Sequence, residues 1–213
     1  MGGSAAWSAL SPPKGYDDVT DQVDVRGLEL LNFDNECGGP RVLFGSHIPS
    51  GLDAGKSKAE TSSKGDEEGK DWVESDIDEQ LMLFIPFQST LKVRSLQITS
   101  VIPRSSDEDD EVPMRPKTVK IYSNRANVLG FDEADDLPAT QSITLKPEDW
   151  DEKTGTAKVE LRFVKFQNIY SLVIFVVDGE GDGEKVRIDR IRVVGEKGEA
   201  REQKKLEKVG EHE

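Results

Sequence analysis

The apolar run Leu81-Met-Leu-Phe-Ile-Pro-Phe87 is the feature that most constrains the fold of this chain. A run this short, with a proline near its end, is typical of a strand buried on both faces rather than of a helix. The segment before the run is acidic, and its carboxylates are Glu74, Asp76, Asp78 and Glu79. We therefore expect these acids at the mouth of a buried strand, where the core gives way to the surface.

Several other segments have the pattern of strands. Tyr170–Val177 is apolar on both phases, which predicts a second central strand. Lys158–Val164 alternates, with Val159, Leu161 and Phe163 expected to face inward. Around seven or eight short strands with no convincing long helix predict an all-β fold, a β-sandwich or jelly roll. Shorter strands are expected at 42–44, 117–123 and 143–145, and a helical turn followed by a strand within 17–31.

Two of the strand segments change phase along their length. Leu91 and Val93 point one way, whereas Leu96 and Ile98 fall on the opposite phase. Because side chains alternate strictly along a strand, all four can be buried only if a bulge or bend occurs near Arg94-Ser95. Val186–Val194 changes phase in the same way.

The chain divides into one domain with polar ends. Residues 1–13 have the composition of a linker or a cloning remnant, and residues 14–196 are expected to form the β domain. Within it, 51–70 has too few large apolar residues to offset its ordering entropy, which predicts a disordered loop. Residues 197–213 are expected to form a charged, flexible tail.

The charge balance limits the classes of partner. The formal net charge is −14 and the pI is about 4.7, and acidic runs at Asp107–Glu111 and Asp132–Asp136 are expected to be solvated loops. This charge opposes binding to nucleic acid or to anionic membranes and favours basic protein partners. Cys37 is the only cysteine, which excludes an intrachain disulfide and a zinc site built from several cysteines. We find no signal peptide and no apolar run near 18 residues, which predicts an intracellular protein.

One acidic segment follows the spacing of a calcium-binding loop. Asp178, Glu180, Asp182 and Asp189 occupy its first, third, fifth and twelfth positions, with Gly183 at the sixth. Strands rather than helices flank the segment, and its third position is glutamate. A glycine-rich acidic hairpin loop is therefore the favoured interpretation, with a weak calcium site as the alternative.

The carboxylates before the first buried strand have two interpretations. Asp76, Asp78 and Glu79 could act as paired acids or hold a metal, but acid–base work needs one acid kept protonated by an apolar pocket, and no such pocket is indicated. The favoured interpretation is that they cap strand ends and pair with cations. The candidate cations are Arg162, Lys165 and Arg187.

Nucleophilic catalysis has little support. His47 and His212 are the only histidines, and both fall in segments expected to be mobile, so neither is placed as a general base. A Cys37–His pair is therefore not expected. His212 could ligate a metal held by a partner, although an ordinary tail residue is favoured. No cofactor is expected.

Three segments together resemble one known family. They are residues 15–32, 73–87 and 162–175, supported by Pro116–Ile121 and by Arg187-Ile188 in the last strand. They resemble the PITH domain, the carboxy-terminal module of thioredoxin-like proteins that associate with the proteasome. The resemblance covers about residues 14–196.

The resemblance implies both a fold and a function. The fold would be a β-sandwich jelly roll similar to galactose-binding-like domains and to the DOC domain of the anaphase-promoting complex. The function would be non-enzymatic docking to the regulatory particle of the 26S proteasome. No Cys-x-x-Cys is present, so the redox activity of full-length relatives does not transfer. The chain is expected to be an excised domain, favoured by its linker-like start, or a stand-alone member.

The site expected from this resemblance is one polar cluster at an end of the sandwich. It would contain Asp76, Asp78, Glu79, Gln80, Arg162, Lys165, Gln167, Asn168 and Arg187. The alternatives are a module that binds a small sugar-like ligand or calcium, and a redox enzyme that uses Cys37. We further expect a monomer with a cytoplasmic and nuclear location.

Overall fold

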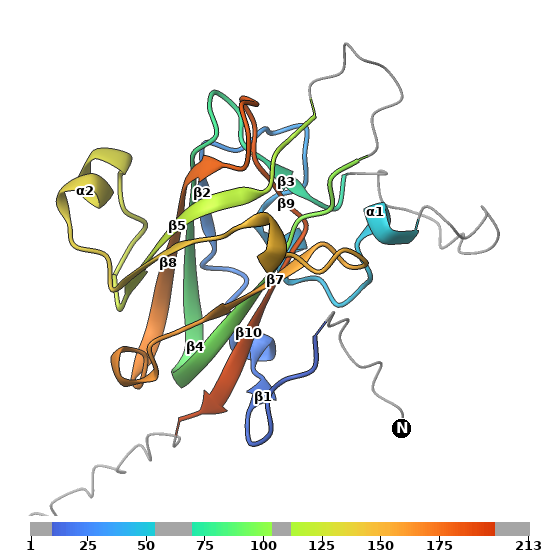
Figure 1. Ribbon diagram of the computed structural model, residues 1–213. Helices are drawn as coiled ribbons and strands as arrows, with labels where there is room; N and C mark the ends of the chain where they lie inside the picture. Colours follow the sequence, from blue (N-terminus) through green and yellow to red (C-terminus); the bar gives the residue numbers. More distant parts are fainter. Residues whose placement is uncertain (1–9, 54–69, 104–111, 199–213) are drawn as a thin grey trace, which may run out of the picture.

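The run that begins at Leu81 opens the long strand β4 (Leu81–Thr99), around which the other strands are arranged (Figure 1). The computed structural model describes residues 10–53, 70–103 and 112–198. The first and second halves of β4 pair with different strands, so one eight-stranded sheet folds over into two layers. The predicted strand is therefore confirmed, and it is the element that the two layers share.

The first half of β4 lies in the first layer. It pairs on one side with β2 (Glu29–Leu31) and on the other with β8 (Ile169–Gly179). Beyond β8 follow β5 (Pro116–Ser123) and β6 (Gln141–Thr144), and all of these pairs are antiparallel. Tyr170–Val177 thus lies within a strand that has neighbours on both sides, as its sequence predicted.

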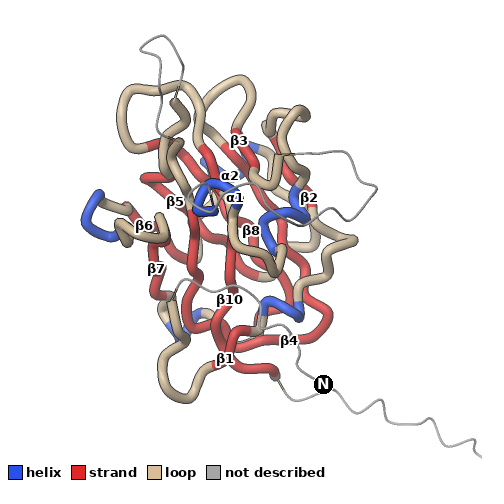
Figure 2. Tube along the Cα trace, turned by 90° about the vertical axis from the view of Figure 1, so that its right-hand side faces the viewer, coloured by secondary structure: helices blue, strands red, loops and turns tan. Residues whose placement is uncertain are grey.

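The second half of β4 lies in the second layer. It pairs with β10 (Arg190–Lys197) on one side and with β7 (Thr156–Glu160) on the other, and β1 (Asp17–Asp18) pairs with β10. A separate two-stranded sheet joins β3 (Val73–Glu74) to β9 (Arg187–Ile188). In Figure 2 the strands fill the middle of the molecule and loops gather at its two ends.

The main core lies between the two layers. Leu83, Ile85 and Ile174 from the first layer share one buried cluster with Ile98 and Val193 from the second. The other face of the first layer is also covered, because the segment with α2 (Phe131–Asp136) packs over Phe84, Val173 and Phe175. Covering both faces explains why β4 and β8 are apolar on both phases.

Both predicted phase breaks are present. The pairing of β10 with β4 skips Arg94, since Val194 lies opposite Ser95 and Gly195 opposite Val93. All four residues expected inside, Leu91, Val93, Leu96 and Ile98, are fully buried. In Val186–Val194 the break falls at Asp189, between β9 and β10.

Three local predictions are wrong. Residues 42–44 lie in the 3-10 helix η2 (Pro40–Phe44) rather than in a strand, because Pro40 begins the turn with its φ already fixed. Asp132–Asp136 belongs to α2, where acids in the first turn suit the helix dipole and Ala134 is buried. Phe163 is half-buried in the 3-10 helix η4 (Phe163–Lys165), because β7 ends opposite Ser95, beside the bulge at Arg94.

The remaining short elements lie between strands. They are η1 (Thr20–Gln22), α1 (Ser50–Asp53) and η3 (Pro147–Asp149). Together with β2, η1 confirms the expected turn and strand in 17–31.

Leu10, inside the predicted linker 1–13, accepts a hydrogen bond from Gln97 through its carbonyl. Residues 54–69 of the predicted loop 51–70, the acidic run Asp107–Glu111 and the tail from 199 onward with His212 lie outside the described residues. Among the residues described, no helix has the length and apolarity to cross a membrane.

Candidate functional site

The segment Asp76–Gln80, called the acidic loop here, joins β3 to β4 and is held by one asparagine. Asn32 follows β2 in the left-handed region, with φ of 58°. Its Nδ2 donates to Asp78 Oδ1 and to the Gln80 carbonyl, both at 2.7 Å, and its Oδ1 accepts from the Ile77 amide at 3.2 Å. The Asp76 amide donates to the Asn32 carbonyl at 3.1 Å. These bonds fix the loop although it is largely exposed.

The fixed loop presents an apolar side chain among carboxylates. Ile77 is 84% exposed, the second most exposed of the large hydrophobic residues in the described part of the chain. Beside it lies a shallow groove of about 360 Å³, called the Ile77 groove, with walls from the acidic loop and from the turn between β8 and β9. Its lining residues are Ile77, Asp78, Glu79, Gln80, Gly183 and Glu184.

The other residues of the predicted cluster lie elsewhere. Leu81 pairs with Val176, whereas Leu91 pairs with Ile169, so the acidic loop and the segment before β8 are at opposite ends of β8. At about 3.3 Å per residue, the length of β8 between these pairs is roughly 23 Å. The prediction of one polar cluster is therefore wrong, because adjacent antiparallel strands begin at opposite ends of a sheet.

The basic and amide residues before β8 are held by local contacts. Lys165 Nζ donates to the Thr140 carbonyl at 3.1 Å, and the Arg162 amide donates to Gln141 Oε1 at 2.8 Å. Gln167 Nε2 donates to the Phe163 carbonyl at 2.8 Å, and Asn168 accepts from Asn124 Nδ2 through its carbonyl at 2.9 Å. None of these four contacts involves the acidic loop. Asp76, Asp78 and Glu79 therefore do not pair with Arg162 or Lys165.

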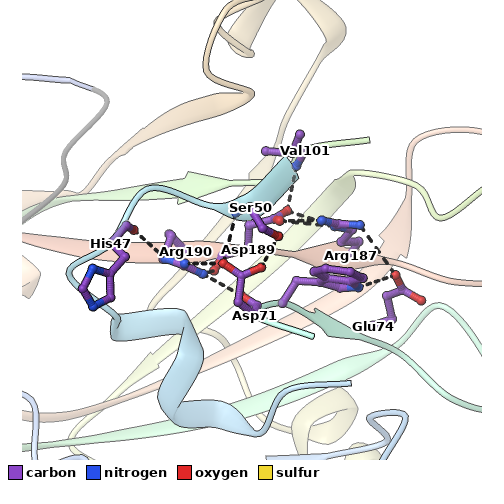
Figure 3. Close-up of polar contacts among 9 residues, drawn as sticks. His47, Ser50, Asp71, Glu74, Val101, Arg187, Asp189 and Arg190 are labelled. Atoms are coloured by element: carbon purple, nitrogen blue, oxygen red, sulfur yellow. Dashed lines mark hydrogen bonds and ion pairs between the residues drawn. The ribbon is translucent and has the colours of Figure 1, made fainter. Parts of the chain in front are cut away.

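Arg187 lies in neither the acidic loop nor the segment before β8, because it forms a buried ion pair with Asp189 (Figure 3). Its Nη2 lies 2.7 Å from Asp189 Oδ1 and its Nε 3.1 Å from Asp189 Oδ2, and both side chains are almost completely buried. The guanidinium stacks 4.0 Å from the centre of the Trp72 ring, and Trp72 Nε1 donates to Glu74 Oε1 at 2.7 Å. Arg187 is thus a fixed structural cation, and its expected pairing with the acidic loop is wrong.

A second buried arginine continues this network. Arg190 Nη2 lies 2.7 Å from Asp71 Oδ2, and its Nε donates to the His47 carbonyl at 3.2 Å. Burial alone would raise the pKa of Asp71, but the hydrogen bonds from Ser50 and Arg190 outweigh it and lower the pKa. The network therefore holds α1 and residue 71 against the start of β10.

A cleft opens beside these ion pairs. It has a volume of about 790 Å³ and is called the Trp72 cleft here. Its walls come from α1, from the chain after β4 and from the turn before β7. The side chains that line it include Trp72, Val101, Ile102, Arg115, Glu152, Lys153 and Arg187.

The calcium-like spacing does not form a ligand set. The carboxylate of Asp189, the twelfth position, already pairs with Arg187 and also accepts a hydrogen bond from the Val101 amide at 2.7 Å. Asp178 Oδ1 accepts from the Thr118 amide at 2.7 Å. Within the described ranges, no three acidic, histidine or cysteine side chains converge as a metal would require. The calcium alternative, with Glu180 and Asp182, is therefore contradicted.

Cys37 has the environment of an unreactive thiol. Burial raises its pKa, and the nearby Glu74 carboxylate adds to the effect. Lys70 Nζ lies 3.9 Å from its sulfur, which only partly opposes that rise. A raised pKa keeps the thiol protonated, and the thiolate is the reactive form.

Sequence reasoning missed Asn32 and the Trp72–Arg187 stack. A signal for Asn32 was present, because asparagine directly after a strand often adopts positive φ and bonds through its side chain. The stack had no comparable signal, since it joins residues far apart in the sequence.

Comparison with known proteins agrees with this architecture. A fucolectin from striped bass (Morone saxatilis) serum superposes with a TM-score of 0.50 at 11% identity, over 86% of this chain and 50% of that one. The fold is thus a β-sandwich jelly roll of the galactose-binding-like kind, as the sequence predicted.

The sequence then places the chain within one family. The PITH domain model matches residues 9–211, and the chain belongs to the PITH domain family. Thioredoxin-like protein 1 of Schizosaccharomyces pombe is 32% identical over 209 residues, which are 97% of this chain and 61% of that protein. A PITH domain-containing protein of Drosophila pseudoobscura pseudoobscura is 28% identical over 84% of this chain and 69% of its own length. The chain therefore spans about three fifths of its thioredoxin-like relative.

Proposed function

We propose that this chain is a non-enzymatic interaction module that docks a thioredoxin-like protein onto the regulatory particle of the 26S proteasome. Two findings support the proposal: membership of the PITH domain family and similarity to a longer thioredoxin-like protein. A monomeric module with a cytoplasmic and nuclear location is part of the same proposal.

The contact surface that we propose is the acidic loop with Ile77. The observation that carries it is the 84% exposure of Ile77 on a loop that Asn32 already fixes. A fixed loop loses little conformational entropy on binding, so burial of Ile77 in a partner would contribute most of its hydrophobic free energy. The surrounding carboxylates would favour a partner with a basic rim and speed its association.

The opposite end of the molecule is the competing docking surface. It carries four other residues of the predicted cluster, Arg162, Lys165, Gln167 and Asn168, near Val164, which is 87% exposed. Its cations suit an acidic partner instead. Two exposed aliphatic residues at opposite ends therefore offer a matched pair of substitutions.

The experiment compares Ile77→Asp with Val164→Asp in co-purification with 26S particles under ATP-preserving conditions. Burying an isoleucine contributes about 1.5–3 kcal/mol, so we expect Ile77→Asp to lower retention by about tenfold or more, with Val164→Asp close to wild type. Both side chains are exposed, and melting temperatures of both variants equal to that of the wild-type chain would exclude misfolding. Loss in Val164→Asp alone would move the contact to the other end. Failure of the wild-type chain to retain the regulatory particle would refute docking itself.

A further inference from the structure

The Trp72 cleft is separate from the proposed docking surface and has the size of a small-molecule site. Its volume of about 790 Å³ lies within the range of roughly 300–1,000 Å³ that is usual for ligand pockets. Val101, Ile102 and Trp72 give the cleft an apolar part of its lining. A ligand in it would meet both apolar and charged groups.

The charges that line the cleft are opposite to those of the whole chain. Arg115, Lys153 and Arg187 face one carboxylate, Glu152, in a protein with a formal net charge of −14. Arg187 is compensated by Asp189, but neither Arg115 nor Lys153 has a carboxylate within 4.0 Å among the residues that the structure describes. Two cations of the lining are therefore available to a ligand.

Arg115 has an additional feature that points to a ligand. Its Nε is buried and has no hydrogen-bond partner in the described part of the chain. Its guanidinium lies 5.4 Å from the centre of the Trp150 ring, a contact that orients the group without using its N–H donors. Buried N–H groups are nearly always paired in folded proteins, so the protein itself does not use this guanidinium fully. Nε is enclosed, but Arg115 is only partly buried and lines the cleft, so the terminal N–H groups are the donors that a ligand would meet.

The wall of the Trp72 cleft that Trp72 and Arg187 form is rigid. Hydrogen bonds from Nε and Nη2 of Arg187 to the Asp189 carboxylate fix the guanidinium, and Trp72 is held between that guanidinium and Glu74. A preformed wall reduces the entropy lost when a ligand binds.

From these observations we propose that the Trp72 cleft binds a small organic molecule that carries a carboxylate or phosphate group. Arg115 and Lys153 bind the oxyanion, and the apolar part of the ligand packs against Trp72 and Val101. Arginine suits this role because its N–H donors match two oxygens of a carboxylate or phosphate. The formal net charge of −14 opposes binding of a long polyanion such as nucleic acid.

Isothermal titration calorimetry of the full chain tests the proposal, with inorganic phosphate, citrate and galactose as the probes. We expect saturable binding of phosphate or citrate that weakens as ionic strength rises, and none of galactose. The stronger of the two anions identifies the group that the cleft prefers.

Matched variants locate the binding. Lys153→Gln changes an exposed turn residue, and Arg115→Gln removes the guanidinium that lines the cleft. Each should weaken anion binding by about tenfold, as expected for loss of a charge-assisted hydrogen bond. Lys165→Gln, at the opposite end of β8, should have no effect.

Three results would overturn the proposal. The first is that neither anion binds with a Kd below about 10 mM. The second is that Lys165→Gln weakens binding as much as Lys153→Gln, which indicates non-specific attraction. The third is saturable binding of galactose alone, which indicates a neutral sugar site.

Discussion

Replacing Asn32 with glycine tests whether the acidic loop is held as the geometry indicates. Asn32 has φ of 58°, which glycine adopts without strain, so the substitution removes the side chain while the backbone can keep its path. It deletes the bonds to Asp78 Oδ1, the Gln80 carbonyl and the Ile77 amide. Alanine would be less suitable, because positive φ would add strain of its own.

The expected loss of stability in Asn32→Gly follows from these contacts. Three partly exposed hydrogen bonds contribute about 0.5 kcal/mol each, and the added freedom of glycine in the unfolded chain costs about 0.5 kcal/mol more. We expect the free energy of unfolding to fall by about 2 kcal/mol, measured by urea denaturation. Hydrogen exchange at the Ile77 amide should accelerate, since that amide loses its acceptor.

Asn124→Gly is the matched control. Asn124 also has φ of 58°, and its side chain binds the Asn168 carbonyl and the Tyr170 amide at the opposite end of β8. It should lower stability by a similar amount but leave exchange at Ile77 unchanged. A loss below about 0.5 kcal/mol in Asn32→Gly, or unchanged exchange at Ile77, would refute the account of the loop.

Two further predictions concern the core and the ion pairs. Phe175→Ala should lower the free energy of unfolding by about 3–5 kcal/mol, because Phe175 is fully buried under α2 with its ring 5.7 Å from that of Phe131; a loss below about 1 kcal/mol in chemical denaturation would contradict this packing. The lowered pKa of Asp71 means that the folded state favours its charged form, so its contribution to stability is complete above the unfolded pKa near 4 and is lost as pH falls through the lower folded value. Acid titration should therefore show less loss of stability below about pH 4 in Asp71→Asn than in wild type, and equal slopes would contradict the shift.

The sequence predicted the parts of the fold that depend on side-chain alternation. The buried strands at Leu81–Phe87 and Tyr170–Val177 followed from apolar residues on both phases, and the bulge at Arg94 followed from the change of phase between Val93 and Leu96. Such features are local, because a strand alternates whatever its neighbours are. They do not indicate which strand ends meet in space.

To place the residues of the candidate site, one must know which strand ends meet in space. Gln80 and Asn168 each precede a central strand, and the family resemblance led us to expect both in one polar cluster. Because β4 and β8 are antiparallel, the two residues lie at opposite ends. Arg187 was expected to pair with the acidic loop, but it is committed to a buried ion pair with Asp189. The spacing Arg187-x-Asp189 was a usable signal, because residues two apart in extended chain can face the same side.

The short β3–β9 sheet supports both surfaces proposed here. Glu74, in β3, accepts from Trp72 on the side of the cleft, and the next residue, Ser75, exchanges hydrogen bonds with Val186 just before the acidic loop begins. Arg187, in β9, forms the rigid wall of the cleft while its strand partner leads directly into Asp76. A buried ion pair is costly to desolvate and is weak evidence for stability alone. The Arg187–Asp189 ion pair lies where the cleft meets the acidic loop. The contacts that fix Arg187 therefore also fix β3, the strand that leads to Ile77.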